Sequence, residues 1–334
     1  MRVPFDELHD TLRRALVAAG MAAGRADLSA RLFAEASRDG VATHGLNRFP
    51  RFMRMVNRGI VDVRARPHLV TAHGAVERWD GARGPGNLNA HESMARAIAL
   101  ARAHGTGIVA LANTNHWMRG GSYGWQAADA GMIGICWTNT QPNLPPWGAA
   151  DPRVGNNPLA IAVPRAAGHV VLDMAMSQFS MGGLAAYRGR GEPLPVAGGY
   201  DTSGALTHDA AAIEATGRLL PAGFWKGSGL SLLLDLTAAL LTGGRATRDI
   251  SPDPDLETGL SQVFLAIDLS TMAADADRDR LADAVIEHLH TGEGAVRYPG
   301  ERTLETRRES MALGVTVDPA IWAGVLTGNW ETAK

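Results

Sequence analysis

The sequence predicts a mixed α/β fold that is divided into more than one lobe. Short apolar runs of β type, such as GIVALA and VFLAIDL, are separated by segments whose apolar residues recur at helical spacing. The 334 residues exceed what a single compact core usually organises. With 46% apolar and 20% charged residues, the composition is that of an ordinary globular protein, and the chain can bury a large core.

The first sixty residues are predicted to be largely helical. Apolar residues recur at helical spacing from Phe5 to Gly20, again up to Gly40, and a third time up to Gly59. Glycine is common at the position that ends a helix, so each of these glycines predicts a helix end.

A fourth helix is expected before the first long apolar strand. Asn89, followed three residues later by Glu92, resembles a capping box and predicts the start of this helix, which Gly105 ends. Strands and helices then alternate. The strands are expected at GIVALA, MIGICW, LAIAV, VVLDM and VFLAIDL, and the helices at about 122–130, 229–242, 277–290 and 303–313.

Charge and cysteine content argue against several classes of protein. The 32 basic and 34 acidic residues leave a formal net charge of -2, and no run of Lys or Arg predicts binding to nucleic acid. Cys136 is the only cysteine, which excludes an intrachain disulfide and a multi-thiolate metal site. The charged start MRVPFDELHD and the interruption of the most apolar segment by Asp235 predict neither export nor membrane insertion. We therefore expect a cytoplasmic protein.

Several familiar cofactor and catalytic motifs are missing. A Rossmann site requires a strand, then G-x-G-x-x-G, then a helix, and Gly105-Thr-Gly107 and Gly227-Ser-Gly229 both have the wrong third spacing. The sequence also lacks a Walker loop, G-x-S-x-G, H-E-x-x-H and any Cys-His metal spacing, so no metal site is predicted.

Polar residues gather first in the segment VATHGLNRF. His44 and Arg48 are four residues apart, so in a helix after Gly45 both side chains can face one cavity. There an imidazole can give a proton to a carbonyl oxygen, and a guanidinium can bind a carboxylate through two hydrogen bonds. From residue types alone, a capping or surface histidine is the more common interpretation of His44.

A second polar group lies in NTNHWMRGGSYGWQAADAG, directly after the predicted strand GIVALA. Asn113, Asn115 and His116 stand where open α/β sheets commonly bind ligands. Ser122 is expected to cap the following helix. The aromatic residues have two interpretations, which are stacking on a cofactor ring and wedging the loop against the core.

A third group joins VVLDMAMS to GFWKGSG. Asp173 stands at the end of a predicted strand. Lys226 precedes a glycine-rich helix start, which suits contact with a polyphosphate or a ribose.

Longer stretches carry a resemblance to a known family. They are THGLNRFPRFMRMVNRG, NTNHWMRGGSYGWQAADAGMIGICWTNT, PPWGAADPRVGNNPLAIAVP, LPVAGGYD and GFWKGSGLSLLLDL. Together they resemble the malate/L-lactate dehydrogenase family that lacks a Rossmann fold, and within it the branch of 2,3-diketo-L-gulonate reductases. The resemblance extends over nearly the whole chain, as far as GVTVDPAIW.

The resemblance implies both an architecture and an activity. The implied fold has a helical lobe from residues 1–78 and 295–334, a lobe with a mixed β-sheet that binds NAD(P) from 79–180 and 245–294, and a small lobe from 181–244. The implied protein is a homodimer with active sites near the subunit interface. Its implied activity is the NAD(P)H-dependent reduction of a 2-oxo acid, which makes it an oxidoreductase acting on a CH–OH group.

Two histidines are implied to take part in the reaction. The histidine of the S/T-H-G motif, which is the proton donor in similar members, corresponds to His44, with Thr43 beside it at the substrate. Other branches assign the acid/base role to the histidine of the N-x-N-H motif, which corresponds to His116. We predict that His44 is the acid and that His116 orients the substrate or serves as the alternative acid/base residue.

The reduction also requires a group that binds the substrate carboxylate. Arg48 or Arg119 is expected to do so. Its guanidinium would neutralise the carboxylate while further negative charge develops on the carbonyl oxygen. Asp173 is expected to orient an imidazole so that its donor nitrogen faces the substrate.

The resemblance to the diketogulonate branch implies the cofactor contacts, and NADH is the expected cofactor. The contacts fall on His169, Val170, Val171, Leu172, Asp173, Met174, Ala175, Trp225, Lys226, Gly300, Glu301 and Arg302. The sequence departs from the branch where Glu301 and Arg302 replace an expected His-Glu pair. Arg302 makes NADP the alternative cofactor, because a guanidinium matches the geometry of a 2'-phosphate.

Substrate identity has several alternatives. The loop TNTQPNLPPWG also departs from the branch, and Gln141 and Asn143 are candidates to line the substrate pocket. The enzymatic alternatives are a dehydrogenase of malate, lactate, sulfolactate or ureidoglycolate, and a reductase of cyclic imino acids. The non-enzymatic alternative is a protein that binds a sugar acid. The joint presence of His44, Arg48, His116 and Lys226 argues against it.

Overall fold

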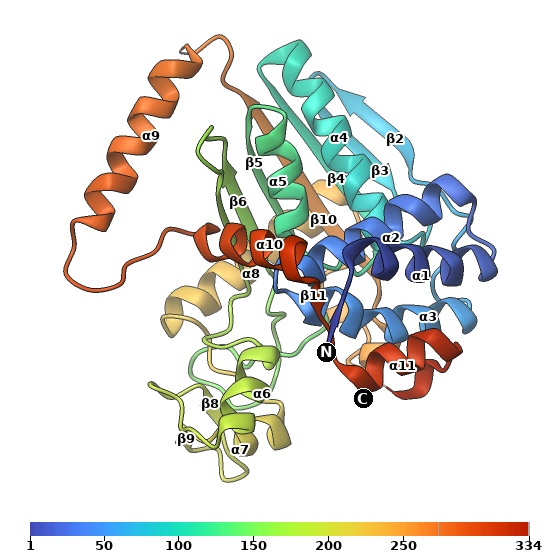
Figure 1. The fold of residues 1–334 in the computed structure, drawn as a ribbon, viewed down its shortest axis with the longest axis vertical. Helices are drawn as coiled ribbons and strands as arrows, with labels where there is room; N and C mark the ends of the chain where they lie inside the picture. Colours follow the sequence, from blue (N-terminus) through green and yellow to red (C-terminus); the bar gives the residue numbers. More distant parts are fainter. Residues whose placement is uncertain (273, 333–334) are drawn as a thin grey trace.

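A computed structural model describes residues 1–272 and 274–332 and confirms the mixed α/β fold. A seven-stranded sheet in the order β2-β3-β4-β10-β5-β6-β7 runs through the molecule (Figure 1). Only β3 and β4 pair in parallel, and the other neighbours are antiparallel. The strands are β2 (His68–His73), β3 (Val76–Asp80), β4 (Thr106–Asn115), β5 (Met132–Thr138), β6 (Leu159–Val163), β7 (Val170–Met174) and β10 (Thr258–Asp268).

The five strands predicted from apolar runs are all present. The longest, β10, pairs with β4 along one edge and β5 along the other. Helices on both faces of the sheet contact it, so its sequence is an almost continuous apolar run. The edge hairpin β2–β3 was not predicted, because every residue of β2 is exposed and its sequence HLVTAH does not alternate between apolar and polar residues.

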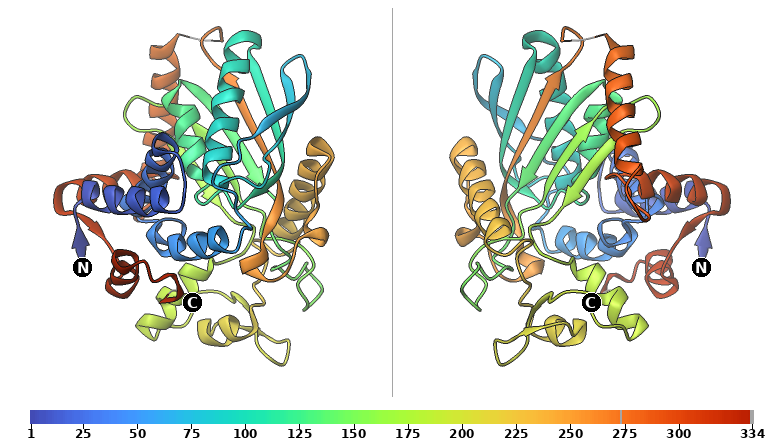
Figure 2. Two further views of the ribbon diagram at one scale, coloured as in Figure 1. Left: turned by 90° about the vertical axis from the view of Figure 1, so that its right-hand side faces the viewer. Right: turned by 90° about the vertical axis from the view of Figure 1, so that its left-hand side faces the viewer.

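Helices cover both faces of the sheet. α4 (Gly86–His104) and α5 (Gly121–Asp129) pack on one face, while α8 (Trp225–Thr242) lies on the other (Figure 2). A core of buried side chains such as Met94, Leu111 and Phe264 joins α4 and α5 to the sheet. None of the helices in the described part of the chain combines the length and the apolar character needed to cross a membrane.

The predicted capping box of α4 was wrong. The helix begins at Gly86, and Asn89 lies inside it, fully buried. The Asn89 side-chain nitrogen donates to the carbonyl oxygen of Gly81 at 2.8 Å and to Thr114 Oγ1 at 3.0 Å. This amide therefore ties the helix to the loop and strand beside it. Gly105 ends the helix as predicted, with a left-handed φ of 83°.

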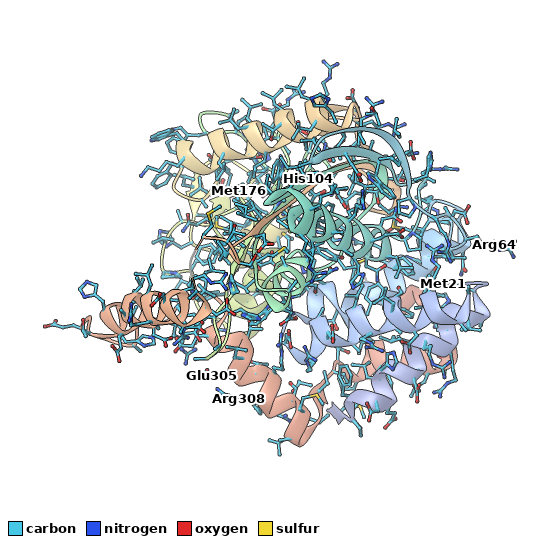
Figure 3. The ribbon with its side chains drawn as sticks, turned by 90° about the horizontal axis from the view of Figure 1, so that it is seen from above. Met21, Arg64, His104, Met176, Glu305 and Arg308 are labelled. Atoms are coloured by element: carbon cyan, nitrogen blue, oxygen red, sulfur yellow. The ribbon has the colours of Figure 1, made fainter. Side chains whose placement is uncertain are left out.

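Helices from the two ends of the chain pack together beside the sheet. Their shared core contains Leu12, Phe33 and Trp322. Figure 3 shows α1 and α2, which meet at the turn that holds the buried Met21. The helices of this group are α1 (Phe5–Ala18), α2 (Ala23–Arg38), α3 (Phe49–Asn57) and α11 (Pro319–Thr327), and the short strands β1 (Arg2–Val3) and β11 (Val315–Thr316) join the two ends of the chain.

The remaining elements lie below the sheet and along its β7 edge (Figure 1). A small cluster around Leu184 and Ile213 holds the lower group together. The lower elements are α6 (Met181–Arg190), β8 (Gly199–Tyr200), β9 (Leu206–Thr207) and α7 (Ala210–Thr216), and the edge carries α9 (Asp275–His290) and α10 (Glu301–Leu313).

Candidate active site

The structure brings together the two histidines predicted to take part in catalysis. Their rings stack with centroids 5.7 Å apart and an interplanar angle of 20°. His44 lies in a 3₁₀ turn (Ala42–His44) after α2, and His116 directly follows β4. Both residues are half-buried. Two distant segments of the chain thus present stacked imidazoles at one place.

Backbone geometry fixes the ring of His116. Met118 has a left-handed φ of 68°, a conformation that is costly for a non-glycine residue and that tends to occur at functional sites. In this conformation the Met118 N–H donates to His116 Nδ1 at 3.0 Å. The proton of the neutral His116 ring is therefore on Nε2.

Burial and nearby positive charge keep both imidazoles neutral. Burial, followed by the guanidinium of Arg48, lowers the pKa of His44 to about 4, while the carboxylate of Asp173 acts in the opposite direction. Burial and Arg48 also lower the pKa of His116 well below its usual value. At neutral pH the ligand-free site therefore holds two uncharged imidazoles next to a fixed positive charge.

This arrangement predicts that acid destabilises the ligand-free protein. The unfolded chain takes up protons at an ordinary histidine pKa near 6.5, whereas folded His44 does so only near 4. The free energy of unfolding should therefore fall as the pH drops from about 6.5 towards 4, by at most about 1.4 kcal/mol per pH unit for each histidine. Urea unfolding at several pH values measures the slope. His44→Gln should flatten it, and an unchanged slope in this variant would contradict the prediction.

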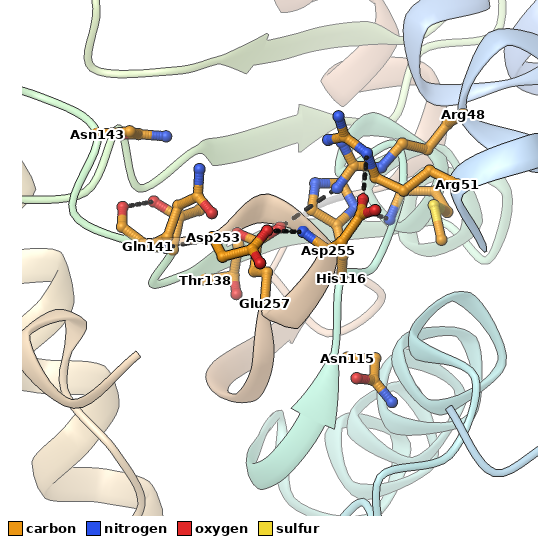
Figure 4. A network of polar contacts seen from close by, with 12 residues as sticks. Arg48, Arg51, Asn115, His116, Thr138, Gln141, Asn143, Asp253, Asp255 and Glu257 are labelled. Carbon is orange, nitrogen blue, oxygen red and sulfur yellow. Dashed lines mark hydrogen bonds and ion pairs between the residues drawn. The ribbon is translucent and has the colours of Figure 1, made fainter. Parts of the chain in front are cut away.

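Arg48 is held in place by a carboxylate that the sequence analysis missed. Its Nη2 lies 3.2 Å from Glu257 Oε2, and the side chains of Arg48 and Glu257 are 18% and 6% exposed. Figure 4 shows this pair beside His116. Glu257 lies just before β10 in an acidic turn that has the composition of an ordinary surface loop, so no sequence signal marked it.

Arg119 is engaged in a buried ion-pair cluster. Its Nη1 lies 2.6 Å from Asp39 Oδ2, and its side chain is 5% exposed. Asp39 also pairs with Arg307 at 2.7 Å and with Arg38 at 2.8 Å. Arg119 therefore shares Asp39 with Arg38 and Arg307. Arg48, which pairs with Glu257, is the arginine whose charge acts on both histidines.

Asp173 bonds to backbone rather than to a ring. Its Oδ2 accepts a hydrogen bond of 2.7 Å from the Gly121 N–H at the start of α5. A side chain at Gly121 would bring its Cβ within 2.9 Å of this oxygen, which explains the Gly120-Gly121 step. Asp173, and not Ser122, is thus the acceptor at the N-terminus of α5. The charge of Asp173 still reaches His44, because it raises the pKa of that imidazole.

The three segments predicted to contact the cofactor all meet at β7. At one end, the Val171 N–H donates to the carbonyl oxygen of Pro299, beside Gly300. Beyond the other end, the carbonyl oxygen of Met176 accepts from the Ala222 N–H, which precedes α8. Residues 169–175 therefore lie next to both other segments, which approach β7 near its opposite ends.

The start of α8 has the features that a phosphate group requires. Trp225 is 66% exposed, and Lys226 is exposed in the first turn of an eighteen-residue helix. The N–H groups of Lys226 and Gly227 donate to the carbonyl oxygens of Gly223 and Ala222, so the attraction for a pyrophosphate comes from the Lys226 cation and the positive end of the helix dipole. These residues fit a dinucleotide cofactor.

Two other predicted cofactor residues have protein partners. His169 Nε2 lies 3.0 Å from Asp129 Oδ1, and the ring of His169 accepts the Arg165 N–H at Nδ1. Glu301 accepts the Tyr298 N–H in the first turn of α10. Arg302 is exposed in the same turn.

The rest of the segment Asn113–Gly131 braces the site. Trp117 and Tyr123 are fully buried against Phe264, so the core interpretation of these aromatics holds. The Asn115 side chain donates to the carbonyl oxygens of Arg83 and Gly84. The Asn113 side chain likewise donates to Asp80. The amide nitrogens of both asparagines thus hold the neighbouring loop, and their contact with a ligand stays a prediction.

Comparison with known proteins gives consistent results. The family model for malate/L-lactate dehydrogenase matches residues 3–326. The chain is 45% identical to the 2,3-diketo-L-gulonate reductase of Citrobacter koseri over 330 residues, which cover 97% of this chain and 99% of that protein. It is 44% identical, with the same coverage, to the protein of that name from Klebsiella pneumoniae.

Solved structures extend the similarity to the whole fold. The sulfolactate dehydrogenase of Methanocaldococcus jannaschii superposes with a TM-score of 0.90 at 25% identity, covering 99% of this chain and 97% of that one. The Δ1-piperideine-2-carboxylate reductase of Pseudomonas syringae gives a TM-score of 0.87 at 31% identity, covering 98% and 99% of the two chains.

Proposed function

Because this chain belongs to the malate/L-lactate dehydrogenase family, we propose that it is an NAD(P)H-dependent reductase whose substrate is 2,3-diketo-L-gulonate or a closely related sugar acid. The observation that carries this proposal is the stack of His44 on His116 beside Arg48. The relatives named as diketogulonate reductases support the choice of substrate, since they match over nearly their whole length.

The residues of this chain can perform the proton and charge steps of such a reduction. A bound reduced nicotinamide supplies hydride to the C2 ketone. Arg48 binds the substrate carboxylate, and His44 gives a proton to the carbonyl oxygen. The Thr43 hydroxyl lies 3.2 Å from His44 Nδ1, and when the ring is protonated this hydroxyl accepts a hydrogen bond from Nδ1–H, so the proton on Nε2 is the one transferred and the ring returns to its neutral form.

Substrate binding also prepares the acid. The guanidinium of Arg48 lowers the pKa of His44 in the ligand-free protein. A substrate carboxylate paired with Arg48 offsets this charge and raises the pKa of His44 towards the range of a working acid. Asp173, whose carboxylate favours the protonated ring, supports the same shift.

The cofactor is held by the three segments that meet at β7. Lys226 and the N-terminus of α8 would bind its phosphates, and residues 169–175 and 300–302 would supply further contacts. We assign NADH as the cofactor, with NADPH as the alternative that the exposed Arg302 favours.

The activity is tested by following oxidation of NADH and NADPH with a panel of acids. The panel contains 2,3-diketo-L-gulonate, oxaloacetate, pyruvate, sulfopyruvate and Δ1-piperideine-2-carboxylate. We expect the highest kcat/KM with the diketo sugar acid. Faster turnover of another member would reassign the substrate, and cofactor binding without oxidation by any acid would favour the sugar-acid binding protein.

We also propose that the protein is a cytoplasmic homodimer. The single cysteine, Cys136, is buried and unpaired, which suits a reducing compartment. The outer face of α8 exposes Leu232 (48%), Leu233 (57%), Leu236 (44%) and Leu240 (80%), and such an apolar face on one helix is typical of an interface.

The dimer predicts a clear effect of charge on this face. Leu233→Glu combined with Leu240→Glu should convert a dimer to a monomer in sedimentation equilibrium, because two carboxylates would be buried without partners at the interface. As a matched control, Leu69→Glu on the exposed edge strand β2 should leave the dimer unchanged. A monomeric parent protein would contradict the prediction.

A further inference from the structure

The loop after β5 places Gln141 next to the carboxylate-binding arginine. The Gln141 N–H donates to Glu257 Oε1 at 3.4 Å, and the other oxygen of Glu257 pairs with Arg48. In Figure 4 the Gln141 side chain lies between Asn143 and Arg48. One glutamate thus fixes both the arginine and the backbone from which the Gln141 side chain extends.

The side-chain oxygen of Gln141 is buried and has no hydrogen-bond partner among the described residues. A buried amide oxygen without a partner is costly, and most such atoms in folded proteins find a donor from the protein, from water or from a ligand. This unused acceptor lies beside the Arg48–Glu257 pair, next to the arginine to which the proposed function assigns the substrate carboxylate.

The neighbouring amide in the same loop is different. Asn143 Nδ2 donates to Asn156 Oδ1 at 3.3 Å, and Asn143 Oδ1 accepts from the Asn156 N–H at 2.8 Å. Both polar groups of Asn143 are therefore used in holding the loop. Of the two amides, Gln141 is the one with an unused acceptor.

Building on the function proposed above, we propose that Gln141 determines substrate specificity by accepting a hydrogen bond from a hydroxyl group on the carbon chain of the substrate. An amide both donates and accepts, as a hydroxyl does, so the two groups are complementary. The preferred substrates are then 2-oxo acids with hydroxyl groups beyond C2, in preference to unsubstituted 2-oxo acids of the same length. With an unsubstituted chain in the site, the amide oxygen would stay without a donor, which disfavours that substrate.

Two acids that differ only in hydroxyl groups test this role. The kcat/KM for NADH oxidation is measured with 2-oxo-3-deoxygluconate, which has hydroxyls at C4 to C6, and with 2-oxohexanoate, which has none. The parent protein should prefer the hydroxylated acid by about 10-fold or more. In Gln141→Met, which keeps the length of the side chain but removes the amide, this preference should fall by about 10-fold.

The matched control is Asn143→Met, which should change kcat/KM for both acids by the same factor. A preference that persists in Gln141→Met, or a parent protein that uses both acids equally, would overturn the role of Gln141 while leaving the reductase intact. If Gln141→Met does not fold, the test uses the parent protein alone, which must prefer the hydroxylated acid for the role of Gln141 to stand. If the parent protein oxidises NADH with no 2-oxo acid, the proposed function itself fails, and the specificity role fails with it.

Discussion

Replacing His44 by alanine is expected to lower kcat for reduction of a 2-oxo acid by roughly 10²–10⁴-fold, which is the usual effect of losing a general acid. Without the imidazole, water must protonate the carbonyl oxygen as its negative charge develops. Steady-state oxidation of NADH measures kcat, and circular dichroism measures whether the variant is folded.

A second variant, in which a histidine far from the site is replaced, shows whether the effect is specific to His44. His73 is exposed at the end of the edge strand β2, so His73→Ala should keep full activity. His116→Ala should lower the rate as well, since His116 stacks on His44. A folded His44→Ala protein with full turnover would remove His44 from the mechanism and leave His116 as the candidate acid.

Replacing Asp39 by alanine is expected to cost about 3–5 kcal/mol of unfolding free energy, as is typical when one partner of a buried ion pair is removed. Asp39 is 1% exposed and pairs with Arg38, Arg119 and Arg307. Its loss would leave the buried guanidinium of Arg119 without its carboxylate. Urea unfolding at neutral pH measures the change.

The surface pair Asp10–Arg13 is the control for Asp39. These side chains are 52% and 37% exposed, so Asp10→Ala should change the unfolding free energy by less than about 1 kcal/mol. If Asp39→Ala also lowers the unfolding free energy by less than about 1 kcal/mol, the buried cluster contributes little to stability.

The pH dependence of the Asp39 cluster follows from the same contacts. Burial raises the pKa of Asp39, but hydrogen bonds and charges from Arg307, Arg119 and Arg38 hold it far below its usual value of 3.8. Because the folded pKa is depressed, this stabilisation is complete above about pH 3.8 and is lost only as the pH falls well below it.

Much of the fold could be predicted because its core elements carry strong apolar patterns. The runs at β4, β5, β6, β7 and β10 are buried strands, and α5, α8, α9 and α10 follow helical spacing. The edge strand β2 and the helix start at Gly86 could not be found. The strand β2 is exposed and lacks an alternating apolar pattern. At the helix start, the predicted capping residue, Asn89, bonds to Gly81 and Thr114. The division into three lobes remains a prediction.

The site was predictable only in part. His44, Arg48 and His116 stand in local polar clusters, the family resemblance implied roles for the two histidines, and the structure brings these residues together. Glu257 and Asp39, which hold Arg48 and Arg119, were missed because their partners lie far away along the chain. Such pairings depend on the tertiary fold, which no local pattern encodes.

The most direct test of the central claim is to follow a deuterium atom from the cofactor to the product. The protein is incubated with a 2-oxo acid and NADH that carries deuterium at the transferable position, and the 2-hydroxy acid is analysed by NMR and mass spectrometry. A reductase that works as proposed places one deuterium on C2. A product without deuterium on C2, or no product at all while the cofactor binds, would contradict the account.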